Sequence, residues 1–219
     1  MNKMGALSAS AIVLAAGSGS RMGNRPKSLL ELNGMTLIEQ QIKALVAAGV
    51  HPLVVVLGHH AAHMARALHP LGVNFAHNPN PGPDPVSSLR IGLQALPSTV
   101  DAVLVALADQ PLITSHDITD LMCAYTHRPA GTHWVQPEVD GLPGNPVMFS
   151  GEVRQQILAA DAGMGGPQWR NEHPEQVHRW NSPNAHYRTD IDTPEDIKTL
   201  AARTGHHLRW PADWTEAPT

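Results

Sequence analysis

Short apolar runs alternate with longer amphipathic segments along the first half of this chain. The runs with the length and residue types of strands are 11–14, 53–57, 73–76 and 102–106. The segments with a helical spacing of apolar residues are 37–48, 60–68 and 87–95. Buried strands separated by helices predict a mostly parallel sheet in a three-layer α/β/α sandwich. Ligands of such sheets bind beyond the carboxyl ends of the strands, so we expect the chemistry there.

The second half of the chain has a less regular pattern, because Pro and Gly interrupt residues 129–146. Thr114 and Asp117 have the spacing of a capping box, which predicts a helix that follows them. Thr193, with a proline directly after it, is typical of the residue that opens a final helix. The remaining predicted elements are strands at 134–139, 146–149 and 177–180 and a helix at 152–160.

The length of 219 residues is enough for one α/β domain with a full core. We predict a single domain over residues 1–219, with a core at 11–203 and a C-terminal tail at 204–219. The net charge of -4 gives no footprint for nucleic acid, so anionic substrates need a few local cations and backbone N–H groups. No apolar run approaches the length of a membrane span and no signal pattern is visible, so we expect a cytoplasmic protein without a membrane partner.

Cys123 is the one cysteine of the sequence, which excludes an internal disulfide and fits a reducing compartment. It lies in the apolar run 121–124, which favours a buried structural thiol over a nucleophile. The sequence also offers no convincing Ser-His-Asp or Cys-His arrangement. A mechanism without a protein nucleophile is therefore the expectation.

A segment of small residues follows the first predicted strand. Its residues are Leu14, Ala15, Ala16, Gly17, Ser18, Gly19, Ser20, Arg21, Met22 and Gly23. Three glycines let the backbone approach a ligand and turn N–H groups toward phosphate oxygens. The glycine spacing fits neither the dinucleotide fingerprint nor the P-loop. Arg21 and Lys27 add cations that suit a triphosphate, and the alternative is an ordinary turn with solvated basic side chains.

Acidic residues stand at two further positions where strands or extended segments end. Asp109 closes the apolar run before Pro111 and should project at the carboxyl edge of the sheet. Asp190 and Asp192 occupy alternate positions and point to the same side if that segment is extended. Carboxylates in this number suit Mg²⁺, which takes one or two of them together with phosphate oxygens and water. Asp192 could instead help to seat the N-terminus of the last helix.

Three motifs together resemble a known enzyme family. The segment Leu14-Ala15-Ala16-Gly17-x-Gly19-x-Arg21-Met22-Gly23-x-x-Pro26-Lys27 resembles the signature of sugar-phosphate and molybdenum-cofactor nucleotidyltransferases. Ala108-Asp109-Gln110-Pro111 is similar to their metal-binding segment, and the stretch 190–196 resembles their closing motif. The particular forms of both look closest to molybdenum cofactor cytidylyltransferase. The resemblance implies the Rossmann-like fold of nucleotide-diphospho-sugar transferases.

The resemblance also implies residue roles. Lys27, Arg21 and Asp109 would be catalytic, the loop from Leu14 to Gly19 would bind the nucleotide with Lys27, and Mg²⁺ would bind Asp109, Asp190 and Asp192. Asn78, Ser87 and Ser88 would form the nucleobase and ribose pocket, although Ser87 could equally be a plain helix cap. Ser88 is then the better candidate for ligand contact.

Gly144, Asn145 and Pro146 resemble the acceptor side of the family. Asn145 stands where cytidylyltransferases often have histidine, so it can hydrogen-bond an acceptor but carries no charge. The segment 161–166 lacks the family's final arginine, for which Arg170 is a possible substitute.

The implied reaction moves CMP from CTP to the phosphate of molybdenum-loaded molybdopterin and releases pyrophosphate. An acceptor phosphate is already anionic, so positioning and charge neutralisation suffice for catalysis. A nucleotidyltransferase for a sugar phosphate or another small phosphorylated acceptor, with a different NTP, is one alternative. A non-catalytic molybdopterin carrier is another. The molybdenum interpretations add a molybdenum hydroxylase apoenzyme as a candidate partner.

Overall fold

One eight-stranded sheet forms the centre of the protein. The computed structural model describes residues 7–82 and 84–212. The strand order is β10 (Val177–Asn181), β7 (Trp134–Val139), β9 (Val147–Ser150), β6 (Ala102–Leu107), β1 (Ala9–Ala15), β4 (Leu53–Leu57) and β5 (Asn74–His77), with β8 (Leu142–Pro143) beside β7. Neighbours pair in parallel except around β9, which is antiparallel to β6 and β7, and at β8, which is antiparallel to β7. The prediction of a mostly parallel sheet is confirmed.

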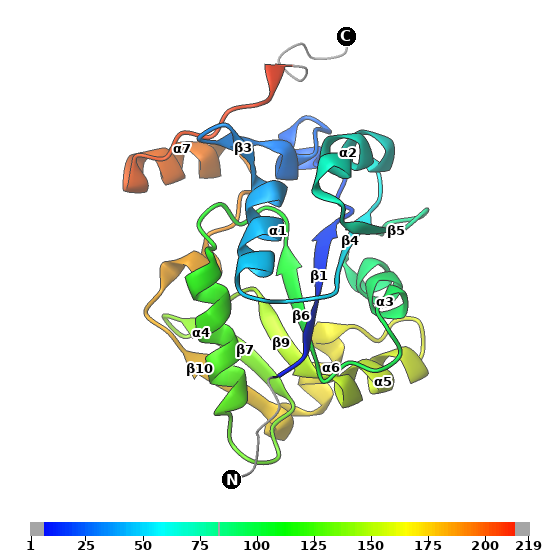
Figure 1. Ribbon diagram of the computed structural model, residues 1–219. Helices are drawn as coiled ribbons and strands as arrows, with labels where there is room; N and C mark the ends of the chain where they lie inside the picture. The colour runs from blue at the N-terminus through cyan, green and yellow to red at the C-terminus, as the bar shows by residue number, and fades with distance from the viewer. Residues whose placement is uncertain (1–6, 83, 213–219) are drawn as a thin grey trace.

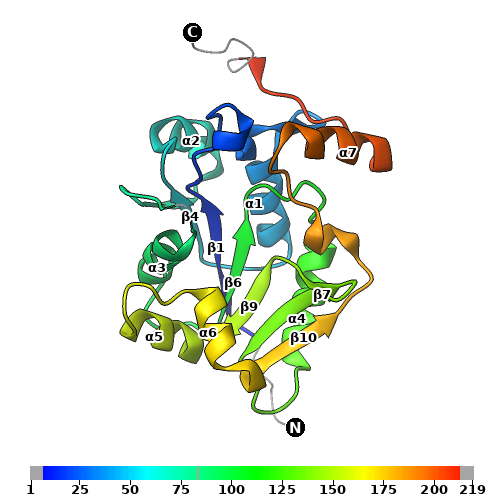
Figure 2. The ribbon, with the colours of Figure 1, turned by 180° about the vertical axis from the view of Figure 1, so that it is seen from behind.

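Helices cover both faces of this sheet, which confirms the three layers. The helices whose apolar residues join one core cluster are α1 (Leu37–Ala47), α2 (Ala61–Leu68) and α4 (Ser115–Thr126). The helices of the opposite cluster are α3 (Val86–Ala95), α5 (Gly151–Ala159) and α6 (Gly166–Glu172). Figure 1 shows α1 and α4 in front of the sheet, and Figure 2 shows α5 and α6 in front from behind.

Local sequence signals place most of these elements. All five residues of β4 are buried, as are the first five of β1, which explains why both strands are continuously apolar. Thr114 and Asp117 form the complete capping box of α4, and Thr193 and Asp196 form that of α7 (Pro194–Thr204). These predictions of helix starts are confirmed.

Three local expectations differ from the structure. Cys123 is exposed, because α4 turns Asp117, Ile118, Leu121 and Tyr125 inward and its apolar run does not reveal that phase. Ser87 is not a helix cap, since α3 already begins at Val86. The short helix α6 was not predicted from the sequence, because its glycine and proline start resembles a loop.

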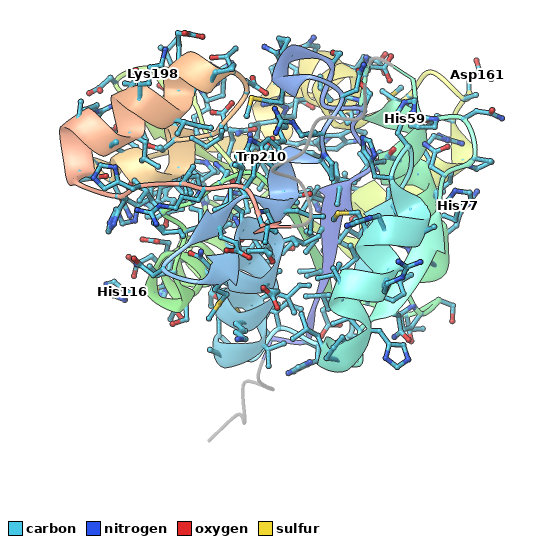
Figure 3. The ribbon with its side chains drawn as sticks, turned by 90° about the horizontal axis from the view of Figure 1, so that it is seen from above. His59, His77, His116, Asp161, Lys198 and Trp210 are labelled. Carbon is cyan, nitrogen blue, oxygen red and sulfur yellow. The ribbon has the colours of Figure 1, made fainter. Side chains whose placement is uncertain are left out.

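The C-terminal tail folds back onto the region that follows the glycine-containing segment 14–23, which we call the glycine loop. Glu31 and Arg209 exchange backbone hydrogen bonds of 2.7 and 3.0 Å, and Leu208 is buried in a small cluster with Leu30. The guanidinium of Arg25 lies 4.7 Å from the ring centroid of Trp210, which Figure 3 labels. The rest of the predicted tail, 213–219, lies outside the described residues. Within the described ranges, no helix has the length and apolar character needed to cross a membrane.

Candidate active site

The predicted site residues meet at one edge of the sheet, which Figure 3 views from above. Strands β1, β4, β5 and β6 end there, and the antiparallel β9 begins there. A cavity at this edge has walls from the glycine loop, Lys27, Ser88 and Asp109. It continues into a second hollow whose walls include Gly17, Ser18, Gly19, Arg21, His59 and Asp192. These two spaces share Gly17 and Lys27 in their walls, and together we call them the nucleotide cavity, after the ligand that the sequence predicts.

The glycine loop needs glycine at one position above all. Gly19 has a φ of 66°, and a Cβ there would lie 1.9 Å from the carbonyl oxygen of Arg25. Its carbonyl accepts hydrogen bonds from the amides of Met22 and Asn24 at 2.8 and 2.9 Å. The loop therefore doubles back tightly and keeps its backbone open toward the cavity.

Lys27 lies between two carboxylates at the base of the nucleotide cavity. Its Nζ is 2.5 Å from Asp109 Oδ2 and 2.5 Å from Asp192 Oδ1. Burial lowers the pKa of the Lys27 ammonium, but the charges and hydrogen bonds of Asp109 and Asp192 outweigh burial and hold this pKa above its usual value. Lys27 is therefore a fixed cation at neutral pH.

Arg21 adds a second cation, since its guanidinium lies 3.1 Å from Asp192 Oδ1. The helix α7 is capped by Thr193 and Asp196, and the backbone N–H of Asp192 donates to Asp196 at 3.0 Å. The Asp192 side chain is thus engaged by Lys27 and Arg21 and does not cap the helix. This arrangement connects the closing motif at 190–196, which we call the closing segment, to the glycine loop.

Asp190 stands next to these groups and also lines another space. The backbone N–H of Ile191 donates to the carbonyl of Asp109 at 3.0 Å, which holds the closing segment against the end of β6. Asp190 lines a separate cavity beside α7, with Leu112 and Leu200. Burial, and then repulsion from Asp109 and Asp192, raises the pKa of the Asp190 carboxyl. An additional cation near these three acids would relieve that repulsion.

The donor set fits a hard divalent cation. Asp109 Oδ1 is buried and accepts no hydrogen bond, so this oxygen can bind a cation without losing another partner. Among the described residues, no three His, Cys, Asp or Glu side chains form a complete ligand set. A site of one or two carboxylates suits Mg²⁺, for which phosphate oxygens and water supply the other ligands.

Of the residues expected at the nucleobase, one lines the cavity and another holds it in place from behind. Ser88 lines the nucleotide cavity, whereas Asn78 is 2% exposed behind it. The Asn78 amide donates to the hydroxyl oxygens of Ser87 and Ser88, each at 2.9 Å. Since each hydroxyl accepts this bond, its own hydrogen is left to donate. Asn78 therefore orients Ser88 toward the cavity.

The predicted acceptor segment lies beside Tyr187, shortly before the closing segment. A Cβ on Gly144 would lie 2.7 Å from the carbonyl oxygen of Tyr187, and the Asn145 N–H donates to that oxygen at 2.7 Å. The Gln110 amide donates to the carbonyls of Asn145 and Tyr187 at 3.1 and 3.2 Å. Pro146 is buried, and Asn145 lines an adjoining apolar cavity. Sequence reasoning missed Gln110, although the Ala108–Pro111 motif contains it.

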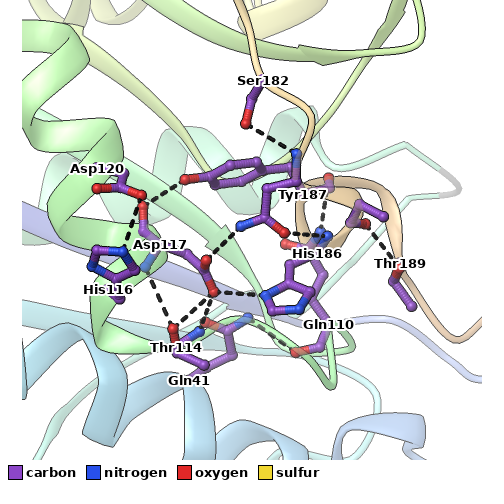
Figure 4. Close-up of polar contacts among 12 residues, drawn as sticks. Gln41, Gln110, Thr114, His116, Asp117, Asp120, Ser182, His186, Tyr187 and Thr189 are labelled. Carbon is purple, nitrogen blue, oxygen red and sulfur yellow. Dashed lines mark hydrogen bonds and ion pairs between the residues drawn. The ribbon is translucent and has the colours of Figure 1, made fainter. Parts of the chain in front are cut away.

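A network around Asp117 anchors the segment that leads to Asp190, as Figure 4 shows. The Asp117 carboxylate accepts from the Asn184 amide at 2.6 Å and contacts His186 Nδ1 at 3.0 Å. The hydroxyl of Tyr187 donates to the Asp117 carbonyl at 2.7 Å. The sequence identified Asp117 only as a helix cap, and only the fold shows that it holds this segment.

Comparisons with known proteins agree with this geometry. Residues 11–177 match the family described as the MobA-like NTP transferase domain. Nicotine blue oxidoreductase of Paenarthrobacter nicotinovorans is 29% identical over 197 residues, which cover 86% of this chain and 94% of that protein. The bifunctional protein GlmU of Mycobacterium avium is 33% identical over 125 residues, or 52% of this chain, and this chain spans only 25% of its length.

Solved structures show the same fold. A nucleotidyl transferase of Methanothermobacter has a TM-score of 0.72 and 26% identity, over 90% of this chain and 96% of that one. A manganese complex of Rv0371c from Mycobacterium tuberculosis has a TM-score of 0.70 and 21% identity, over 90% and 100%. A complex of CMP:2-keto-3-deoxy-manno-octonic acid synthetase with CTP has a TM-score of 0.68 and 15% identity, over 90% and 98%. This chain therefore has the nucleotide-diphospho-sugar transferase fold, as expected.

Proposed function

This chain belongs to the MobA-like NTP transferase family, and from that premise we propose that it transfers CMP from CTP to the phosphate of molybdenum-loaded molybdopterin. Residues 1–219 would act as one nucleotidyltransferase domain. The observation that carries the proposal is the position of Lys27, held by Asp109 and Asp192 at the base of a cavity formed by the glycine loop. A cation fixed beside open backbone amides suits a triphosphate.

The nucleotide would lie along the loop from Leu14 to Gly19. Lys27 and Arg21 would neutralise charge on the triphosphate and then on the departing pyrophosphate. The hydroxyl of Ser88, oriented by Asn78 together with Ser87, would contact the nucleobase or ribose.

Asp109 and Asp190 would hold Mg²⁺, because Asp109 Oδ1 has no other partner and because burial, and then repulsion from Asp109 and Asp192, raises the pKa of the Asp190 carboxyl. Asp192 would remain with its two cations. When bound, the ion would neutralise phosphate charge and orient the substrate oxygens. A protein with the same fold forms a manganese complex, which is consistent with a divalent ion as the cofactor.

The acceptor would approach past Gly144, Asn145 and Pro146. One of its phosphate oxygens attacks the α-phosphorus of CTP, the bond from that phosphorus to the bridging oxygen breaks, and pyrophosphate leaves with the bond electrons. The phosphate is already an anion, so no side chain has to remove a proton first. The chain's own residues contribute position and charge. The product would then pass to a molybdenum hydroxylase apoenzyme.

The choice of CTP depends on the motif forms around Asp109 and Asp190. The CTP complex of a protein with the same fold is a reason to test CTP first. The match to GlmU over 52% of this chain keeps a sugar phosphate as the alternative acceptor.

A second candidate function is an oxidoreductase. It is favoured by the 29% identity to nicotine blue oxidoreductase, which extends over 86% of this chain. The fixed cation and the acid cluster favour triphosphate chemistry, because an oxidation or reduction of a small molecule needs neither.

Pyrophosphate release separates these functions. We would incubate the protein and Mg²⁺ with CTP, GTP or UTP, each with molybdenum-loaded molybdopterin or glucosamine 1-phosphate. Release that requires CTP and the molybdopterin is the expected result. Release with another nucleotide or with the sugar phosphate would correct the substrates. No release with any pair, together with oxidation of added NADH or NADPH that requires nicotine blue, would replace the proposal by the second function. Molybdopterin binding without release would indicate a carrier.

A further inference from the structure

The cavity beside α7, which Asp190 lines, is a space of its own. It encloses about 330 Å³, at the lower end of the range of roughly 300–1,000 Å³ that is typical of small-ligand pockets. Its walls come from one face of α7, from the segment 185–191 and from Leu112. Among the described residues, it shares none with the nucleotide cavity. A ligand here would therefore not touch the triphosphate.

Arg188 and Arg203 bring two guanidinium groups to this cavity from different elements. Arg188 ends the 3₁₀ turn Ala185–Arg188, and Arg203 lies in the last turn of α7. No described residue gives either guanidinium a hydrogen bond, an ion pair or a ring contact. By contrast, Arg90 donates to five backbone carbonyls and Arg154 to four. The donors of the two cavity arginines are therefore available to a ligand.

Two acids in the same walls do not pair with these arginines. The Asp196 carboxylate accepts from the backbone N–H groups of Asp192 and Thr193 at 3.0 and 2.7 Å, so it is occupied at the start of α7. In the described part of the chain, no ion pair joins Asp190 or Asp196 to either arginine. Both guanidinium groups therefore lack an anionic partner that the chain itself supplies.

His186 lines the cavity as well, and Asp117 holds its ring in one orientation (Figure 4). The distance from His186 Nδ1 to Asp117 Oδ2 is 3.0 Å, and the Asp117 side chain is 4% exposed. The same carboxylate accepts from Thr114 and Asn184, so the acceptor itself is fixed. A carboxylate only accepts, which places the imidazole proton on Nδ1. Nε2 has no partner among the described residues, and when protonated it adds a third cationic donor to the cavity.

This set of donors matches a phosphate group better than a carboxylate. Two guanidinium groups and one imidazole offer more N–H donors than two carboxylate oxygens accept. A phosphate has three or more oxygens and a charge of about −1.5 to −2 near pH 7, and guanidinium groups bind it through paired hydrogen bonds. Leu112 and Leu200 border the charged groups, and apolar neighbours strengthen ionic contacts by keeping water away.

We propose that the cavity beside α7 is a second anion site, in which Arg188, Arg203 and His186 bind the phosphate group of a small molecule. The site goes beyond the transfer reaction, since none of these side chains lines the nucleotide cavity. Free phosphate, pyrophosphate and an organic phosphate share the group that the site recognises. They differ in size and charge, so their relative affinities identify the source.

Titration calorimetry of the full chain tests this site directly. We would titrate inorganic phosphate, pyrophosphate and glucose 6-phosphate, each with and without saturating CTP and Mg²⁺ to fill the nucleotide cavity. Binding of at least one phosphate should persist with CTP, and Arg188→Met or Arg203→Met should weaken it at least about tenfold, because each removes charged hydrogen bonds. Arg203→Lys keeps the charge without the paired donors and should lose part of the affinity. The matched control is Arg66→Met, which removes an exposed arginine of α2 and should change affinity less than about twofold.

Several outcomes would overturn the second anion site. Loss of all phosphate binding when CTP is present would assign the anion to the nucleotide cavity. Equal affinities of the wild type and both methionine variants, with unchanged thermal unfolding, would remove the role of the arginines. Tighter binding of citrate than of every phosphate would contradict the ligand class, and no binding of any phosphate would refute the site.

Pyrophosphate release separates this site from the proposed function. Arg188→Met and Arg203→Met lie outside the proposed catalytic groups, so loss of phosphate binding with retained nucleotidyl transfer would support both proposals. Phosphate binding in a protein that transfers no nucleotide would refute only the transfer reaction. Transfer by a wild type that binds no phosphate beside α7 would refute only the second anion site.

Discussion

Replacing Lys27 by methionine removes one charge and leaves two carboxylates without their shared partner. Breaking a fully buried ion pair costs about 3–5 kcal/mol and breaking an exposed one costs about 1 or less. The Lys27 side chain is 23% exposed and that of Asp109 is 15% exposed, so the pair lies between these limits. We expect the free energy of unfolding to fall by about 2 kcal/mol, which lowers Tm by about 4–8 °C in a domain of this size.

The same change should have a larger effect on turnover. Removal of one preorganised group that stabilises charge in a transition state commonly costs a factor of about 100 or more, or about 2.7 kcal/mol. Pyrophosphate release under saturating CTP measures the turnover, and calorimetric or optical melting measures Tm. Lys43→Met, on the exposed face of α1, is the matched control and should change neither quantity.

The double variant Lys27→Met/Asp192→Asn tests the cause. If the loss of the shared ammonium beside these carboxylates is responsible, the double variant should be more stable than the sum of the single changes predicts. Near-normal turnover of Lys27→Met would refute the role given to Lys27. A strict sum of the stability effects would refute the argument that this lysine and Asp192 form a coupled pair.

Three further predictions concern the loop, the closing segment and the tail. Gly19→Ala should weaken CTP binding in calorimetry at least tenfold (about 1.4 kcal/mol), because the φ of Gly19 is 66° and a Cβ there would clash with the backbone of Arg25. The control Gly17→Ala should have a much smaller effect, since no atom lies within 4 Å of a Cβ at that position. Burial raises the Asp117 pKa, but hydrogen bonds from His186 and Thr114 outweigh burial and leave this pKa below the ordinary 3.8. The ionised carboxylate therefore stabilises the folded protein above pH 3.8, and this stabilisation is lost as the pH falls through the lowered pKa. Urea unfolding should therefore show a flatter acid limb for Asp117→Asn, and an unchanged limb would contradict this. Trp210→Ala should lower Tm by a few degrees and weaken CTP binding, and equal values would show that the tail does not support the loop.

The sequence by itself determined the local elements and which residues follow the carboxyl end of each strand. Five consecutive apolar residues in β4 and the capping boxes at Thr114 and Thr193 act within a few positions of the chain, so they are visible without tertiary structure. The motifs also indicated which polar residues stand at the ends of strands. That is enough to predict the fold class and a phosphate-binding edge.

Only the tertiary structure decided how these residues face one another. Lys27 and Asp192 are separated by 165 positions, and their contact depends on the closing segment lying against β6. Arg90, Arg154 and Arg170 cannot be distinguished by residue type, yet carbonyl groups satisfy two of them and leave the third with unused donors. The physical reason is that propensity and capping act between neighbours along the chain, whereas burial and ion pairing depend on distances in space that the packed sheet alone establishes.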